Sequence, residues 1–232
     1  MMTQKRFNAL LSMLLCAAML LSMAAMLSGC TRSGNNDSPA LQHKILHYYS
    51  EKDSTSYFFV DGKKLEDRIG SGISTFLSVD GTSAAVIAAT ALYRVDANGI
   101  ILVYPAAVTR AVLSMDGKSI LFATATKAFL YSSDTGETTE FEGIEAETVL
   151  SLALSEDAKT AAVTVGQKGG RTATYICFEG KAEKNSEDTY AVAISNGAER
   201  MYCLEYVDGE LTGRLHFVQN GKDSVISTNA SH

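Results

Sequence analysis

A short motif recurs along the chain at a nearly constant interval. It reads LSVDGTS from Leu77, LSMDGKS from Leu113, LSEDAKT from Leu154 and ISNGAER from Ile194, with starting residues 36, 41 and 40 positions apart. A second landmark, an aromatic-containing segment that ends on a glycine turn, follows the motif in each unit. A fixed period of this length indicates a repeat architecture, in which each unit buries its apolar surface against its neighbours.

Each unit divides into short strand-like segments. The unit that holds the third copy of the motif, LSEDAKT, contains ETVLSLALS, KTAAVTV, TATYICF and KAEKNSE, separated by turns rich in Gly, Asp and Glu. Short apolar or alternating segments bounded by such turns are typical of β-hairpins. The chain has only two prolines, and helical periodicity is absent after residue 30. The sequence therefore predicts an all-β fold.

The pattern within the segments favours radial stacking of four-stranded sheets. The runs SAAVIAATALY and KTAAVTV do not alternate cleanly, so both faces of these strands are expected to contact protein. Small residues suited to crowded inner strands are Ala84, Ala85, Ala88, Ala89, Ala161 and Ala162. The fourth segments, KAEKNSE and ETTEFEG, are polar, as outer edge strands should be. Four strands in a period near 40 predict a β-propeller.

The stretch LSMDGKSILFATATKAFLYSSDTGETTEF resembles the WD40-like repeat of bacterial TolB-type propellers. In that repeat a Ser-x-Asp-Gly-Lys turn opens a strand and a Leu-Tyr strand closes on a glycine turn. The matching residues are Ser114, Asp116, Gly117, Lys118, Leu130, Tyr131 and Gly136. The resemblance covers most of residues 57 to 228, although Ala158 replaces one turn glycine and the chain contains no Trp. It implies a fold and a binding role, with no catalytic residue to transfer.

The number of blades follows from the glycine turns. They lie at Gly62, Gly99, Gly136, Gly180 and Gly221 and indicate about five blades within a propeller domain at 45–228, before a tail at 229–232. The first unit, from KILHYYS to KKLEDRI, supplies only three strands, and no spare strand follows DSVIST. Two interpretations stay open, a small propeller with an imperfect seam or one part of a larger ring.

The N-terminus has the order of a secretory signal. Lys5 and Arg6 precede an uncharged apolar run from Ala9 to Leu27, which we expect to be a signal helix. An uncleaved anchor is the alternative, because a membrane span needs about 20 apolar residues.

The end of this run resembles the lipobox of bacterial lipoproteins. Leu27, Ser28 and Gly29 occupy the three positions before Cys30. The resemblance implies a signal peptide at 1–29 and a diacylated Cys30 that becomes the mature N-terminus. Acyl chains contribute about 0.8 kcal/mol per buried methylene, so they would hold the domain at a membrane. The polar segment TRSGNNDSPA lies in the predicted flexible tether at 30–44.

Charge and cysteine content exclude several classes of site. The formal net charge is −6 and no basic cluster occurs, which argues against a nucleic-acid partner. Cys177 and Cys203 lie in apolar segments and could form a disulfide, but two separate buried thiols are the favoured interpretation. No CxxC or Cys/His spacing typical of a metal site is present, and no cofactor is expected.

Three groups of residues invite a functional interpretation. Asp80, Asp116 and Asp157 could form a ring of metal ligands, but their position at turns favours Asx-type hydrogen bonding. His43 and His47 have the spacing of a helical metal pair without a third ligand, so we expect them to be solvated. An aromatic cluster that could stack on sugar or peptide, but is expected to be core, comprises Tyr48, Tyr49, Tyr57, Phe58 and Phe59.

These observations favour a non-catalytic binding module. No nucleophile elbow, phosphate loop or HExxH motif occurs, so the sequence predicts no catalytic residue. The expected role is a lipoprotein outside the bacterial cytoplasmic membrane, presenting loops to an envelope protein, peptide or glycan. The alternatives are a propeller-type hydrolase acting on glycans and an accessory propeller for a catalytic or assembly partner on another chain.

Overall fold

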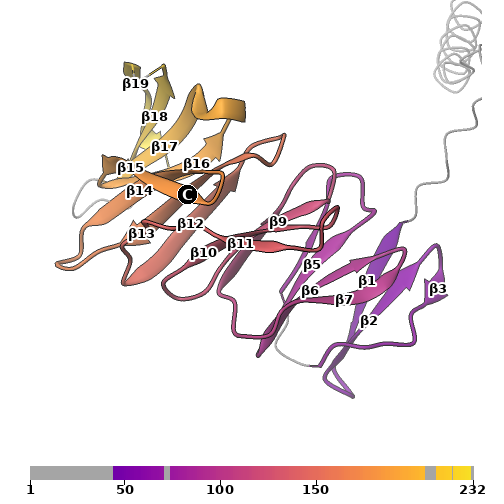
Figure 1. Cartoon of the computed structure of the whole chain (residues 1–232). Coiled ribbons are helices and arrows are strands. Elements are labelled where there is room, and N and C mark those ends of the chain that lie inside the picture. Colours follow the sequence, from indigo (N-terminus) through magenta and orange to yellow (C-terminus); the bar gives the residue numbers. More distant parts are fainter. Residues whose placement is uncertain (1–43, 71–73, 207–212, 221, 231–232) are drawn as a thin grey trace, which may run out of the picture. The chain divides into compact units, whose positions relative to one another are not determined.

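The computed structural model describes residues 44–70, 74–206, 213–220 and 222–230. These ranges contain nineteen β-strands and one short 3-10 helix (Figure 1). The predicted signal peptide, Cys30, His43 and all of the tether except Lys44 lie outside them. Within these ranges the all-β prediction is confirmed.

The strands form five antiparallel sheets, each built from consecutive segments of the chain. The first contains β1 (Ile45–Ser50), β2 (Thr55–Val60) and β3 (Lys63–Lys64). The second contains β4 (Ser74–Leu77), β5 (Ala84–Ala88), β6 (Ala91–Asp96) and β7 (Gly99–Tyr104). The third contains β8 (Arg110–Leu113), β9 (Ser119–Ala123), β10 (Ala128–Ser132) and β11 (Thr138–Glu140).

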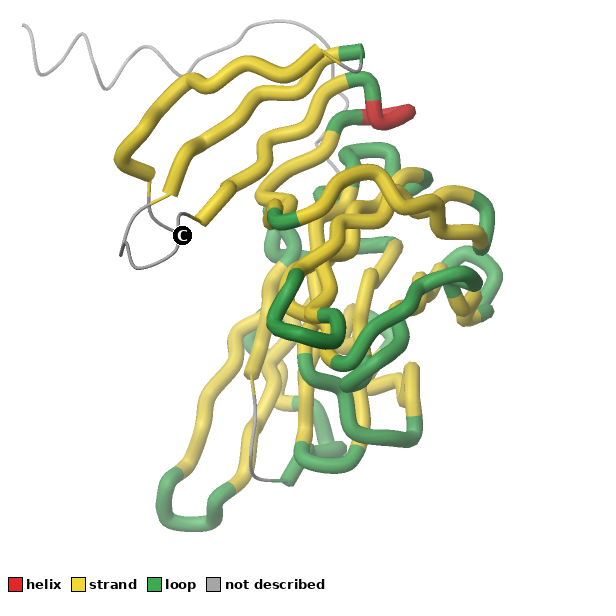
Figure 2. The backbone as a smooth tube through the Cα atoms, turned by 90° about the vertical axis from the view of Figure 1, so that its left-hand side faces the viewer, coloured by secondary structure: helices red, strands yellow, loops and turns green. Residues whose placement is uncertain are grey.

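The last two sheets repeat the same plan. The fourth contains β12 (Thr148–Leu154), β13 (Thr160–Gly166), β14 (Thr172–Phe178) and β15 (Lys181–Glu187). The fifth contains β16 (Thr189–Ile194), β17 (Arg200–Tyr206), β18 (Gly213–Gln219) and β19 (Lys222–Ala230), with the helix η1 (Asn196–Ala198) between its first two strands. Figure 2 shows that strands make up most of the described backbone. β19 runs to Ala230, two residues past the predicted domain boundary at 228.

The four strands predicted for the unit that holds the third copy of the motif are confirmed as β12 to β15 of the fourth sheet. All of β13 except its last residue is buried, whereas β15 is largely exposed, as expected of an inner and an outer strand. The three-stranded first unit is also confirmed. One detail differs: Ala89 lies in the exposed turn between β5 and β6, because the strand ends at Ala88.

Successive sheets bury apolar side chains against each other. Leu121 and Val163 belong to a cluster shared by the third and fourth sheets, and Ala162 and Met201 belong to one shared by the fourth and fifth. Two further clusters join the first sheet to the second and the second to the third. Because burying a Val or Leu side chain contributes about 1.5–3 kcal/mol, these contacts stabilise the stack. The internal sheets therefore have protein on both faces.

The repeated Ser-x-Asp-Gly motif forms a structural turn. The Asp116 carboxylate accepts hydrogen bonds from the Ser114 hydroxyl (2.7 Å) and the Lys118 backbone N–H (3.0 Å). The hydrogen bond from Ser114 lowers the pKa of Asp116. Asp80 and Asp157 make the same pair of contacts in their own turns. The expectation of Asx-type hydrogen bonding is thus confirmed for all three aspartates.

Candidate functional site

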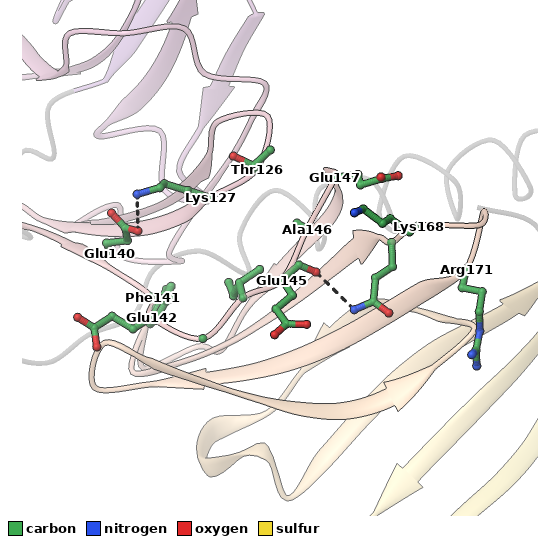
Figure 3. A pocket seen from close by; sticks show the side chains of 13 residues that line it. Thr126, Lys127, Glu140, Phe141, Glu142, Glu145, Ala146, Glu147, Lys168 and Arg171 are labelled. Atoms are coloured by element: carbon green, nitrogen blue, oxygen red, sulfur yellow. Dashed lines mark hydrogen bonds and ion pairs between the residues drawn. The ribbon is translucent and has the colours of Figure 1, made fainter.

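A hollow of about 760 Å³ lies where the third sheet meets the fourth (Figure 3). Its lining comes from three connections: the turn after β9, the segment 140–147 between β11 and β12, and the turn after β13. The Ser-x-Asp-Gly turns lie at the other ends of these strands. The hollow therefore belongs to the loop face opposite the repeated motif, where sequence can vary without disturbing the sheets.

Backbone hydrogen bonds hold the longest of these connections in place. The Phe141 N–H donates to the Ala128 carbonyl (3.0 Å), and the Phe141 ring is buried between the sheets. The Glu142 N–H donates to the Gly180 carbonyl (2.9 Å), and the Ala182 N–H donates to the Glu142 carbonyl (2.8 Å). This connection is thus fastened to both sheets, which makes the floor of the hollow part of the scaffold.

The rim carries charges of both signs. Lys127 forms an ion pair with Glu140 (2.8 Å), and both side chains are about half exposed. Lys168 and Arg171 face the hollow from the turn after β13. The remaining carboxylates of the rim, all exposed, are Glu142, Glu145 and Glu147. Exposed ion pairs contribute at most about 1 kcal/mol to stability, so these groups can exchange partners with a polar ligand.

A second polar cluster lies in the fifth sheet. The His216 ring has its Nδ1 2.9 Å from the Asp223 carboxylate and its Nε2 3.1 Å from Glu205, and His216 pairs with Cys203 across β17 and β18. This grouping contains the residue types of a cysteine nucleophile with its base. However, burial raises the pKa of Cys203 to about 11, and both ring nitrogens already contact carboxylates. The raised pKa keeps the thiol protonated near pH 7, which disfavours it as a nucleophile.

Sequence analysis did not identify the His216 cluster, because strand register alone brings its members together. Over the described ranges, no group of three His, Cys, Asp or Glu side chains has the arrangement of a metal site. His47 is less solvated than predicted: its half-buried ring stacks on Phe58 at 4.9 Å, and Nε2 lies 2.8 Å from the Ser56 hydroxyl. Burial lowers the pKa of His47. His43 lies outside the described residues.

The aromatic cluster is divided between the two faces of the first sheet. Phe58 is fully buried, as predicted, but Tyr48 and Tyr49 are exposed, and Tyr57 and Phe59 are only half-buried. The Lys64 ammonium lies 3.8 Å from the centre of the Tyr57 ring. The core prediction is therefore correct for Phe58 and wrong for the exposed tyrosines. Tyr48 points to the opposite face from Phe58, because side chains alternate along a strand, whereas Tyr49 shares the face of Phe58 but is still 43% exposed near the end of β1.

The predicted lipid-attachment residues Leu27, Ser28, Gly29 and Cys30 lie outside the described residues. Among the residues that the structure does describe, no helix is both long and apolar enough to cross a bilayer.

The two described cysteines are free and buried, which confirms the favoured interpretation. Burial raises the pKa of Cys177 to about 12 and that of Cys203 to about 11. We expect a thiol reagent to label neither residue in the folded protein near pH 7, and both after unfolding in urea, as peptide mapping would measure. Because the folded state disfavours the thiolates, stability should fall as the pH rises above the ordinary thiol pKa of 9.0. Rapid labelling of folded protein would contradict this.

Comparisons with known proteins reveal a shared fold. No protein-family model matches the chain, and no curated protein matches its sequence. Dipeptidyl peptidase 4 of Porphyromonas gingivalis superposes with a TM-score of 0.57 and 10% identity, over 82% of this chain and 38% of that one. For Kuenenia stuttgartiensis hydrazine synthase the values are 0.51, 12%, 78% and 62%. A putative TolB from Agrobacterium tumefaciens gives 0.51, 15%, 79% and 76%.

The chain spans less than two thirds of the length of the first two of these proteins. At such low identity the likeness concerns the fold alone. Together with the five stacked sheets, it supports a TolB-type β-propeller fold, as the repeat predicted.

Proposed function

We propose that this protein is a non-catalytic binding module, tethered by lipid on Cys30 to the outer side of a bacterial membrane. The observation that carries the binding role is the hollow of about 760 Å³ between the third and fourth sheets. Its volume is that of a small-ligand or peptide pocket, and it sits on a fixed scaffold between variable loops. A ligand with both acidic and basic groups, such as an envelope peptide, matches the charges of the rim.

The character of the rim carboxylates favours binding over hydrolysis. A glycosidase needs a general acid whose pKa is raised by an apolar or crowded environment. The glutamates at this hollow are exposed to water, and Glu140 is already paired with Lys127. Binding through charge pairs requires no such burial. The two alternatives, a glycan hydrolase and an accessory propeller, would require respectively a shielded carboxylate pair and a partner chain.

The binding role is tested by reversing one charge at the hollow. Lys168 and Lys159 flank opposite ends of β13, but only Lys168 lines the hollow. We expect Lys168→Glu to reduce capture of solubilised envelope peptides and glycan fragments at least fivefold, with Lys159→Glu within twofold of the unmodified chain. Quantitative mass spectrometry of the captured material measures both. Equal capture by the two variants would place the binding site elsewhere.

The tether is tested separately. We expect mass spectrometry of the native protein to find a mature N-terminus at Cys30 carrying acyl chains, and Cys30→Ser to abolish that modification. A native chain with its leader intact and no acyl group would refute the tether while leaving the binding role in place.

A further inference from the structure

The outward face of the first sheet has the composition of a buried sheet face. In β1 and β2, the residues pointing away from the second sheet are Leu46, Tyr48, Tyr57 and Phe59. We call these four residues the leading face. Leu46 is 64% exposed and Tyr48 is 57% exposed, and the two tyrosine rings stack at 6.5 Å. Such a row of apolar side chains is unusual on a free surface.

The third sheet carries the equivalent residues in a covered position. There the set is Ile120, Phe122, Phe129 and Tyr131, with the same cross-strand pairing as the leading face. Ile120 and Phe122 have no exposed surface. Their cover is the second sheet, whose Tyr104 ring packs at 5.2 Å from Phe122 and 5.1 Å from Phe129. By this equivalence, the leading face is shaped to receive a preceding sheet.

The fifth sheet has a partly exposed face on the side away from the fourth sheet. Tyr202 and Phe217 pair across β17 and β18 with their rings 5.1 Å apart, and Tyr202 is 41% exposed. We call Tyr202, Leu215 and Phe217 the trailing face; Leu204, which pairs with Leu215 on the same side of the sheet, is only 2% exposed. The corresponding pair in the third sheet, Leu121 and Leu130, packs against the following sheet. The trailing face is thus shaped to receive a following sheet.

Within the described ranges, no hydrophobic cluster joins the first sheet to the fifth. The described sheets form four interfaces, and in each one the face of one sheet that corresponds to the trailing face packs against the face of the next sheet that corresponds to the leading face. One face of each kind is left over. We propose that the leading face binds the trailing face of a second copy of this chain, which repeats once more the packing already used within it.

This inference goes beyond the proposed ligand-binding role, because both faces lie away from the hollow between the third and fourth sheets. Association through two different faces is heterologous, so it forms a closed ring if the rotation between successive copies closes and an open filament if it does not. Charge does not drive the contact, since both faces are apolar apart from Lys64 beside Tyr57. Desolvation of the aromatic side chains supplies the driving force.

The test uses two differently tagged copies of the full-length chain in detergent micelles. We expect the unmodified copies to co-purify, and Tyr48→Lys or Tyr202→Lys in both copies to reduce co-purification at least tenfold. Both side chains are exposed, so the variants should keep the folded β-sheet spectrum. Phe178→Lys is the matched control, because Phe178 is a 48% exposed aromatic outside both faces. It should leave co-purification unchanged.

A charge pair identifies the faces as partners. A chain carrying both Tyr48→Lys and Tyr202→Glu should again co-purify with a second tagged copy of itself, because each contact then joins a lysine to a glutamate, whereas a chain carrying both Tyr48→Lys and Tyr202→Lys should not. Absence of co-purification by the unmodified chain would overturn the proposal, because the faces would then be joined within one chain or left free. Co-purification that persists in both Lys variants would also overturn it and would locate the association in another part of the chain.

Discussion

Replacement of Gly117 by alanine is expected to lower the free energy of unfolding by about 3 kcal/mol. Gly117 has a φ of +66°, where a side chain costs about 1–2 kcal/mol. An added Cβ would overlap the Ser83 hydroxyl and lie 2.9 Å from the Ser78 Cβ, both in the turn between β4 and β5 of the second sheet. The overlap adds an overpacking cost of about 1–3 kcal/mol. Urea denaturation followed by circular dichroism measures the loss.

Gly136→Ala separates the two causes. Gly136 has a similar φ of +72°, but nothing lies within 4 Å of an added Cβ. This variant should lose only the backbone cost, about 1–2 kcal/mol. If Gly117→Ala were no more destabilising than Gly136→Ala, the close contact between the second and third sheets at this turn would be wrong.

Arg94→Met should lower the free energy of unfolding by about 3–5 kcal/mol. The buried Arg94 guanidinium donates to the Asp96 carboxylate (2.9 Å) and to the Gly117 carbonyl (2.6 Å), so it connects the second sheet to the third. Removal of one partner of a buried ion pair leaves an uncompensated charge, which is the costly event. Among the described residues, Asp96 would keep one hydrogen-bond donor, the Asn98 backbone N–H (2.8 Å). Urea denaturation again provides the measurement.

Two variants test this explanation. Arg94→Met combined with Asp96→Asn should recover part of the loss, because no buried charge then remains unpaired. Arg171→Met removes an arginine whose ion pairs with Glu187 and Asp188 are largely exposed, and it should cost less than about 1 kcal/mol. Equal losses from Arg94→Met and Arg171→Met would show that Arg94 is not shielded from water.

Much of the fold could be predicted because its signals are local. Turn chemistry at Asp80, Asp116 and Asp157 and the strand periods between the turns identified the repeat and the number of units. The sequence also showed where one copy departs from the repeat: Ala158 stands where the first two copies have glycine, and it still adopts a φ of +57°. The boundaries of β12 to β15 in the fourth sheet agreed closely with the prediction, since hydrophobic alternation and turn residues act within one hairpin.

The candidate site was much less predictable. The hollow brings Lys127 together with Lys168 from a different sheet, and the His216 cluster depends on the register of three strands. Neither grouping has a sequence motif, because its members meet only after sheets stack or strands pair. The sequence predicted that the Cys203 thiol would be buried, but it did not predict that His216 would pair with Cys203 on the neighbouring strand.

The chain by itself determined that five small sheets would form, that the outer strands of the third and fourth sheets would be polar and that the first sheet would lack a strand. Those features follow from periodicity and turn residues inside single units. Tertiary structure decided which apolar faces are covered. Ile120 and Phe122 are fully buried, whereas Leu46 and Tyr48, equivalent in pairing and character, are exposed. The reason is physical: burial of a sheet face depends on the neighbour that packs against it, and a strand's own sequence does not specify that neighbour.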